Sequence, residues 1–442
     1  MNNKKVYPAV KYLQARQSEY LFCIDESKWK LDKNHTINVE DVSHILSPKL
    51  IEGYLNTLAF YACNYSSAYV VKINDNMKDF LKKTSSVFIS ELDILNYKAF
   101  LSEINMQKLI ILRCFFKKWH SIGYYGVDDN AIIILKSMRL KAKTPGAIIK
   151  QEDPNKGALT DNEHKTLNLA MHNAYKNKKI THLEFSLALL VSLTGRRSSQ
   201  IIALKFKDII KETFVNGDDG FFLKFPRVKQ GVSFRQAFRM LNIDEFLYNT
   251  IIKQANYSIS LIENNIGRSL ILEEKNEVPV FLDSKKYKII SGSREDFYLL
   301  TSDRLHASAN IVSLSLKKIV EKENVISERT GECMKVNAYR LRYTLGTRLA
   351  HKGYSVQVIA ELLDHSSTLS AGIYIENLPD NAIKINGAIS TNLAFLADVF
   401  LGKTKINESI NNKKLLTRKG CSSWGSYSKA PCNGCIYFKK FK

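Results

Sequence analysis

Four residues between positions 339 and 374 have types and spacing that suit chemistry on a phosphate group. Tyr339 and Arg342 lie three residues apart, so a helix would place both side chains on one face. His365 follows 23 residues after Arg342, and Tyr374 follows nine residues after His365. The guanidinium group of an arginine stays charged and can donate two hydrogen bonds to a phosphate. A tyrosine hydroxyl can attack such a phosphate, so these residues together indicate phosphoryl transfer to a side chain.

Apolar residues around these four recur at helical intervals and predict the elements that must hold them in place. Gly353 is a predicted helix end, and Ser355 is the predicted N-cap of the next helix. We therefore expect short helices packed around one core. The apolar positions that show this pattern are Leu345, Leu349, Val356, Ile359, Leu362 and Leu363.

The charge of the chain indicates an anionic partner. Its 442 residues include 65 Lys and Arg against 43 Asp and Glu, which gives a formal net charge of +22. The basic residues are spread along the sequence among 21 Tyr and 22 Phe, as in proteins that bind nucleic acid. We therefore expect binding to double-stranded DNA that weakens as the salt concentration rises. A basic surface that is only solvated is the alternative.

Cysteine usage and the N-terminus indicate where the protein works. The chain has seven cysteines, an odd number, and Cys23, Cys63, Cys114 and Cys333 stand singly. This pattern favours reduced thiols and a cytoplasmic, DNA-associated protein. The first residues lack the apolar core of a signal peptide. No run approaches the roughly 18 consecutive apolar residues of a membrane span, so we expect no membrane partner.

The first third of the chain shows a helical pattern after an N-terminal segment without a motif. Residues 51–140 contain apolar repeats that predict a helical DNA-binding domain, with Ser90 as the N-cap of one helix. Basic side chains on its exposed faces would contact a duplex, although a helical bundle with solvated lysines explains them equally well. Prolines and glycines in residues 141–158 predict a linker.

The following domain mixes helices with a small amount of β-structure. Thr160 and Glu163 form a predicted capping box, and Gly195 ends a buried helix. Residues 221–240 alternate basic and apolar side chains and predict a β-hairpin with a basic tip. The expected fold is therefore mainly α with a small β-hairpin or sheet. It has five segments, namely an accessory segment at 1–50, a helical DNA-binding domain at 51–140, a linker at 141–158, a mixed α/β catalytic domain at 159–400 and a basic, cysteine-containing tail at 401–442.

Three boxes in this sequence resemble the signature of the tyrosine recombinases, the phage integrase family. Thr194-Gly195-Arg196-Arg197 resembles the TGxR box of the family. RLRYTLGTRLAHKG, which begins at Arg340, resembles its LRHTFATHLL segment. ELLDHSSTLSAGIYIE, which begins at Glu361, resembles its LLGHSS…IY box. Because the three boxes occur in the right order and at the right intervals, residues 158–378 are identified as a tyrosine recombinase catalytic domain.

The resemblance implies a site-specific DNA recombinase of the integrase or transposase type, encoded by a mobile genetic element. Arg197 and Arg342 would bind the non-bridging oxygens of the scissile phosphate and stabilise its transition state. Tyr374 would attack phosphorus and form a 3′-phosphotyrosyl link, and His365 would hydrogen-bond the phosphate. Lys229, which resembles the hairpin lysine of the family, would protonate the departing 5′-oxygen. The family needs neither a metal ion nor ATP, so no cofactor is expected.

Two residues depart from the family pattern. Tyr339 stands where the family usually has histidine, and a tyrosine is a poor general base near neutral pH. Gln200 stands where the family tends to have glutamate. Tyr339 counts as a site residue, and the group that accepts the proton of Tyr374 stays open. A catalytically weak or silent DNA-binding subunit and a type IB topoisomerase are the alternative functions.

The resemblance also implies that the chain acts on double-stranded recombination sites as a homotetramer, alone or with sister recombinases of the same element. The tail beyond residue 400 raises a separate question. It holds Cys421, Cys432 and Cys435. The two-residue spacing of Cys432 and Cys435 suits a tetrahedral Zn²⁺ site, with Cys421 as a third ligand. No fourth ligand is evident, so free thiols and a redox pair stay alternatives.

Overall fold

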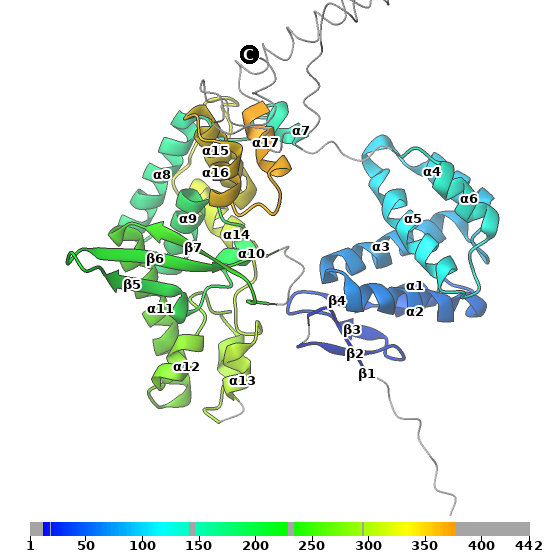
Figure 1. Cartoon of the computed structure of the whole chain (residues 1–442), viewed down its shortest axis with the longest axis horizontal. Coiled ribbons are helices and arrows are strands. Elements are labelled where there is room, and N and C mark those ends of the chain that lie inside the picture. The colour runs from blue at the N-terminus through cyan, green and yellow to red at the C-terminus, as the bar shows by residue number, and fades with distance from the viewer. Residues whose placement is uncertain (1–11, 18, 141–145, 229–233, 294–295, 377–442) are drawn as a thin grey trace, which may run out of the picture. The chain divides into compact units, whose positions relative to one another are not determined.

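The computed structural model describes residues 12–17, 19–140, 146–228, 234–293 and 296–376 (Figure 1). Contacts between Cα atoms divide these residues into two compact units. The first unit combines the described residues before 146 with those between 202 and 308, and the second combines residues 146–201 with residues 309–376. Residues 202–308 thus belong to a different unit from the helices that precede and follow them.

The N-terminal part of the first unit consists of two small hairpins followed by helices (Figure 1). β1 pairs antiparallel with β2, and β3 pairs antiparallel with β4. Ser90 caps α4 through a hydrogen bond to the backbone of Asp93, as its sequence position predicts. The elements are β1 (Tyr12–Gln14), β2 (Leu21–Cys23), β3 (Lys28–Lys30), β4 (Thr36–Asn38), α1 (Glu40–Ser43), α2 (Pro48–Asn64), α3 (Ser67–Thr84), α4 (Glu91–Phe100), η1 (Glu103–Asn105), α5 (Gln107–Ser121) and α6 (Asp129–Ser137).

One hydrophobic core joins these hairpins to the helices. Phe22 and Trp29 come from the hairpins, are almost fully buried and have ring centroids 4.8 Å apart. Trp119 of α5 is also fully buried, and its ring packs edge-on against Phe115. The described part of the predicted accessory segment therefore packs into the same core as the helices that follow it. This packing does not test the five predicted segment boundaries, which stay predictions.

The second part of the first unit begins with a three-stranded antiparallel sheet in the order β5-β6-β7. β6 (Asp219–Pro226) pairs with β5 (Ile209–Thr213) on one side and with β7 (Phe238–Ile243) on the other. The β6–β7 pair confirms the predicted hairpin, although residues 229–233 of its tip lie outside the described residues. The remaining elements are η2 (Phe206–Asp208), α11 (Glu245–Ile266), α12 (Leu272–Glu277), η3 (Lys286–Ile289) and α13 (Asp296–Thr301).

The second unit is helical and holds five of the six predicted catalytic residues (Figure 1). α15 packs against α9, and both α16 and α17 pack against α15. α14 packs against α8 and α9 and also contacts α15. The elements are α7 (Ala147–Lys150), α8 (Asp161–Lys176), α9 (His182–Thr194), α10 (Ser198–Ile201), α14 (Asn310–Lys322), α15 (Ala338–His351), α16 (Val356–Leu362) and α17 (Leu369–Glu376).

Helix ends in the second unit follow the predicted capping residues. Thr160 and Glu163 exchange side chain to backbone hydrogen bonds at the start of α8, which confirms the capping box. Gly195 ends α9 in a left-handed conformation with φ of 57°. Ser355 caps α16 by accepting a hydrogen bond from the backbone of Val358. These signals depend on neighbouring residues alone, which is why the sequence locates them.

The described chain is mainly helical with three small antiparallel sheets, which confirms the predicted fold class. The sheet of the β5-β6-β7 segment lies between helical segments in sequence, as expected for a mixed α/β domain. Among the described helices, none is both long enough and apolar enough to cross a membrane.

A four-residue helix inside the predicted linker, α7, packs against the helix of Tyr374. Ile149 of α7 is buried in the same apolar cluster as Tyr374 and Ile359. Gly146, directly before α7, has φ of 74°, and a Cβ atom there would lie 2.3 Å from Cγ2 of Ile373 on α17. Glycine is therefore required by the left-handed backbone and also by the close approach of α17.

Replacement of Phe22 by alanine tests whether the hairpins belong to the N-terminal core. We expect the free energy of unfolding of this part to fall by about 3–5 kcal/mol, the usual cost of removing a buried phenyl ring. Urea unfolding, followed by the fluorescence of Trp29 and Trp119, measures the change. Leu21→Ala is the matched control, because Leu21 is adjacent but 59% exposed. Equally small effects from both variants would contradict a shared core.

Gly146→Ala should destabilise the second unit more than Gly353→Ala. Both glycines have left-handed backbones, with φ of 74° and 81°, so each alanine costs about 1–2 kcal/mol of strain. Only the methyl group at residue 146 would meet Ile373, because a Cβ atom at Gly353 has nothing within 4 Å. Overpacking should add about 1–3 kcal/mol at residue 146. Thermal unfolding measures the difference, and equal melting temperatures would contradict the packing of α7 on α17.

Candidate active site

Arg342 of α15 is buried although it carries a charge. The residue is 4% exposed, and its Nη1 donates a hydrogen bond of 2.8 Å to the backbone oxygen of Gly195. Its Nη2 is also buried and has no hydrogen-bond partner among the described residues. A buried donor of this kind costs free energy unless an acceptor reaches it. The arrangement therefore suits an anionic ligand.

The segment after α9 brings a second arginine to the end of α16. A Cβ atom at Gly195 would lie 2.9 Å from Cδ2 of Leu345, so only glycine lets the end of α9 approach α15 this closely. Arg197, which is half-buried, donates from Nη1 to the backbone oxygen of Asp364 over 2.9 Å. Gly195 and Arg197 thus connect the end of α9 to residues that lie about 150 positions later in the sequence.

Arg196, at the variable position of the TGxR box, is a third arginine near the site. It is 1% exposed. Burial, followed by the positive charges of Arg197 and Arg196, lowers the pKa of Arg342 to about 10. Because like charges oppose one another, a bound anion would stabilise all three guanidinium groups. The residue types around Arg196 in the sequence do not indicate that it lies near Arg342. Its burial and its electrostatic effect on Arg342 appear only in the structure.

Tyr374, the predicted nucleophile, is 3% exposed on α17. Its ring lies against Gly346 of α15, where a Cβ atom would be 2.5 Å from Cζ of the tyrosine. Burial raises the pKa of Tyr374 to about 12, although the positive charges of Arg342 and Arg197 act in the opposite direction. The hydroxyl group is therefore protonated near neutral pH and would have to lose its proton to act as a nucleophile.

The imidazole of His365 lies beside the ring of Tyr374. The two ring centroids are 6.3 Å apart, and the ring planes differ by 16°. The turn between α16 and α17 thus holds the imidazole parallel to the phenol. The structure brings Arg197, Arg342, His365 and Tyr374 into one cluster of the second unit. Their roles in catalysis stay predictions.

Tyr339 differs from these residues because it faces solvent. It lies in the first turn of α15 and is 58% exposed. Its ring centroid is 6.3 Å from that of Tyr343. Tyr343 is partly buried against the apolar cluster that contains Tyr374. Tyr339 shares α15 with Arg342, as predicted, but the structure does not bury the two together, and the role of Tyr339 stays a prediction.

The other predicted site residues, Lys229, Cys421, Cys432 and Cys435, lie outside the described residues. Lys229 falls in the tip between β6 and β7, and the three cysteines fall in the C-terminal tail. Across the described ranges, no group of three His, Cys, Asp or Glu side chains is placed so that it could hold a metal ion.

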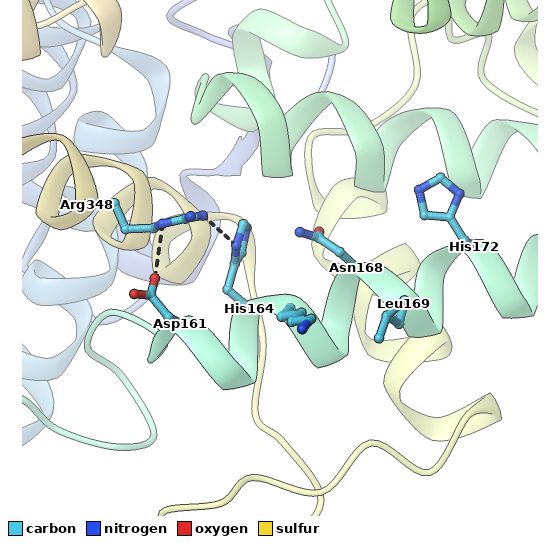
Figure 2. A pocket seen from close by; sticks show the side chains of 7 residues that line it. Asp161, His164, Asn168, Leu169, His172 and Arg348 are labelled. Carbon is cyan, nitrogen blue, oxygen red and sulfur yellow. Dashed lines mark hydrogen bonds and ion pairs between the residues drawn. The ribbon is translucent and has the colours of Figure 1, made fainter. Parts of the chain in front are cut away.

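A hollow of about 390 Å³ lies on α8 and α15 and is lined by none of the predicted catalytic residues (Figure 2). Arg348 crosses it, donating from Nη1 to Nδ1 of His164 over 2.9 Å, with its Nε 3.1 Å from Oδ1 of Asp161. Burial and the charge of Arg348 lower the pKa of His164. The His164 ring is therefore neutral and its Nε2 lies 3.1 Å from Oγ of Ser192. Arg348, His164 and Asp161 therefore pair with one another across this hollow.

Comparisons with known proteins identify the family. The model of the phage integrase family matches residues 158–380, just over half of the 442 residues. This match agrees with the range of 158–378 expected from the three boxes. None of the curated proteins matches the chain.

Several solved structures are similar to this chain at low sequence identity. XerH site-specific recombinase bound to a palindromic difH substrate is 16% identical, over 80% of this chain and 92% of that one, with a TM-score of 0.45. A lambda integrase dimer bound to a COC′ core site is 14% identical, over 76% and 80% of the two chains, with a TM-score of 0.45. The Tn1549 transposon integrase with transposon right end DNA is 13% identical, over 77% and 98%, with a TM-score of 0.44.

The arginines, histidine and tyrosine of the three boxes lie in one cluster, and the family match covers every one of them. The chain therefore belongs to the phage integrase family and is a tyrosine recombinase, an enzyme that breaks and rejoins DNA strands.

Proposed function

We propose that this cluster binds the scissile phosphate of a DNA strand and that Tyr374 attacks it. Arg342 provides the main support, because its buried Nη2 has no hydrogen-bond partner among the described residues while its charge acts on Tyr374. A non-bridging phosphate oxygen would accept from Nη2, and a second would accept from Arg197. The net charge of +22 suits the phosphates on either side of the cleavage point.

The proposed reaction is a transesterification at phosphorus. Tyr374 first gives up its phenol proton, to an acceptor that stays open. Its oxygen then attacks in line, so that a bond between phosphorus and the tyrosine forms as the bond to the 5′-oxygen breaks. The strand stays attached through a 3′-phosphotyrosyl link, and the departing 5′-oxygen takes a proton, which we assign to Lys229. Attack of a 5′-hydroxyl from another strand reverses the step and joins the new ends. The link conserves the energy of the phosphodiester bond, so no ATP is needed.

The positively charged side chains would stabilise the negative charge that develops during this reaction. Negative charge grows on the phosphate oxygens in the transition state, and Arg197 and Arg342 are placed to stabilise it. We propose that they do so without a metal ion. His365 hydrogen-bonds the phosphate and keeps the phenol of Tyr374 parallel to its own ring. Tyr339 is exposed to solvent and contacts the DNA rather than the buried phenol.

In the cell, we propose that the chain is a site-specific recombinase of a mobile genetic element, acting as an integrase or transposase. Four copies would assemble on two double-stranded recombination sites, alone or with sister recombinases of the same element. Membership of the phage integrase family and the basic charge support this proposal. Strand exchange needs two sites, because each 5′-hydroxyl must find a phosphotyrosyl link on a different strand.

A catalytically silent DNA-binding subunit is the second candidate. Two observations favour it. Tyr374 as a whole residue is only 3% exposed, and Tyr339 occupies the position where the family usually has histidine. Such a subunit would bind the same DNA but would form no covalent link to it.

Covalent trapping tests the proposed nucleophile. Duplexes from the DNA that flanks the gene, each with a nick beside one phosphate, should form a covalent adduct with the wild-type chain. The nick lets the short 5′-end diffuse away, so the phosphotyrosyl link accumulates and denaturing electrophoresis detects it. Tyr374→Phe should form no adduct. Tyr343→Phe is the matched control and should keep it, because Tyr343 packs beside the site without taking part.

Two outcomes of this trapping experiment, and one outcome of a plasmid relaxation assay, would contradict the proposal. An adduct that persists in Tyr374→Phe would exclude Tyr374 as the nucleophile. Tight DNA binding with no adduct from the wild type would favour the silent subunit. Relaxation of a supercoiled plasmid that lacks any sequence of the element would favour a type IB topoisomerase.

Arg342→Lys tests the phosphate-binding role separately. Lysine keeps the charge but cannot donate two hydrogen bonds in a fixed plane. We expect adduct formation at saturating DNA to slow by about 10²–10³-fold, as for the loss of one transition-state donor. Gel-shift binding should change little, because one residue contributes a small part of the contact with DNA. An unchanged cleavage rate would contradict the assignment.

A further inference from the structure

Asp364, the residue before His365, is buried at an unusual backbone conformation. It is 0% exposed, and its φ is 53°, in the left-handed region. Glycine adopts this conformation freely, whereas a residue with a side chain does so at a cost in free energy. The LLGHSS box of the family has glycine at this position. A side chain here indicates contacts that offset the cost.

The backbone oxygen and the side-chain carboxylate of Asp364 both accept hydrogen bonds from the segment that follows α9. Its backbone oxygen accepts from Nη1 of Arg197 over 2.9 Å, and its Oδ2 accepts from Nε2 of Gln200 over 2.8 Å. The backbone N–H of Arg197 donates to Oε1 of Gln200 over 3.3 Å. These three hydrogen bonds close a ring through Arg197, Gln200 and Asp364. The ring joins the guanidinium group of Arg197 to the turn that carries His365.

Asp364 also brings a negative charge to the cluster of arginines. Burial and the charges of Arg197 and Arg196 lower the pKa of Arg342, and the carboxylate of Asp364 acts in the opposite direction. The carboxylate thus offsets part of the repulsion between the guanidinium groups. It does so without occupying Nη2 of Arg342, which has no hydrogen-bond partner in the described part of the chain.

Gln200 is the partner that this carboxylate requires. The residue is fully buried, and its amide group donates where a glutamate could not. A glutamate at position 200 would place a second carboxylate beside Asp364, and two such charges oppose each other. Gln200 replaces the glutamate of the family pattern, and Asp364 replaces the glycine of its third box. The two departures from the pattern are therefore hydrogen-bonded to each other.

We propose that Asp364 is a positioning residue, which sets the guanidinium group of Arg197 and the imidazole of His365 around the scissile phosphate, with Gln200 as its matched donor. The carboxylate that the family pattern has at position 200 stands at position 364 in this chain. This proposal rests on the proposed function, because the phosphate is the ligand that the positioned groups would bind.

A reciprocal exchange of the two side chains tests the proposal on the nicked duplex that traps the wild type. Asp364→Gly relaxes the backbone but removes the carboxylate, and it should slow adduct formation at saturating DNA by about 100-fold, as expected when a reacting group is misplaced by about 1 Å. Gln200→Glu, with two facing carboxylates, should slow it by a similar factor. The Gln200→Glu/Asp364→Asn double variant restores one acid and one amide, so its rate should recover to within about tenfold of the wild type.

Two controls separate positioning from folding. Lys178→Gly relaxes another left-handed residue of the same unit, with φ of 56°, and should leave the cleavage rate unchanged. Cleavage rates are compared only among variants whose DNA affinity, measured by gel shift, and melting temperature are similar to those of the wild type. Asp364→Asn alone keeps the shape of the side chain and is the milder variant if Asp364→Gly does not fold. Its cleavage rate should fall by about tenfold, the loss of one charge-assisted hydrogen bond.

The outcomes distinguish this proposal from the proposed function. A wild-type rate in Asp364→Gly would mean that only the backbone conformation matters and would overturn the proposal. The proposal would also be overturned if the slowing in the double variant equalled the product of the slowing in Gln200→Glu and in Asp364→Asn. Binding of inorganic phosphate, measured by calorimetry, should weaken in Asp364→Gly. If it weakens while no protein, the wild type included, forms an adduct, then the positioning role holds and the proposed function fails.

Discussion

A buried positive charge is the constraint around which the second unit is built. Burying a guanidinium group costs free energy unless hydrogen bonds and negative charge offset the cost. Nη1 of Arg342 donates a hydrogen bond to the backbone oxygen of Gly195, whereas its buried Nη2 has no partner among the described residues. The nearby arginines increase the cost rather than reduce it. The positive charge of this cluster is therefore only partly compensated, and the proposed phosphate ligand would offset more of it.

Close packing at glycines holds the groups that surround this charge. Gly195 lets the end of α9 approach α15, and Gly346 lets the ring of Tyr374 lie on α15. In both places a side chain would meet atoms of the neighbouring element at less than 3 Å. Because helices carry Arg342 and Tyr374, small changes in helix packing would shift these side chains by distances that matter for the proposed reaction.

Tyr374, the predicted nucleophile, is also packed against α7, which lies within the predicted linker. Ile149 of α7 shares the apolar cluster of Tyr374, and Gly146 lies against Ile373. Lys150 and Glu376 add an ion pair of 2.9 Å, which is exposed and therefore contributes little. The position of α17 thus depends on apolar contacts with residues 146–149 of the predicted linker. A substitution at these residues would directly disturb the packing of Tyr374.

The sequence by itself determined the local features of this protein, namely the capping boxes, the β6–β7 hairpin and the types of the reacting residues, because these depend on near neighbours. Helical spacing placed Tyr339 and Arg342 on α15 but could not show that one is exposed and the other buried. Only the tertiary structure paired Gln200 with Asp364, which are 164 residues apart. Contacts over such separations depend on how whole helices pack, and no local pattern records that packing.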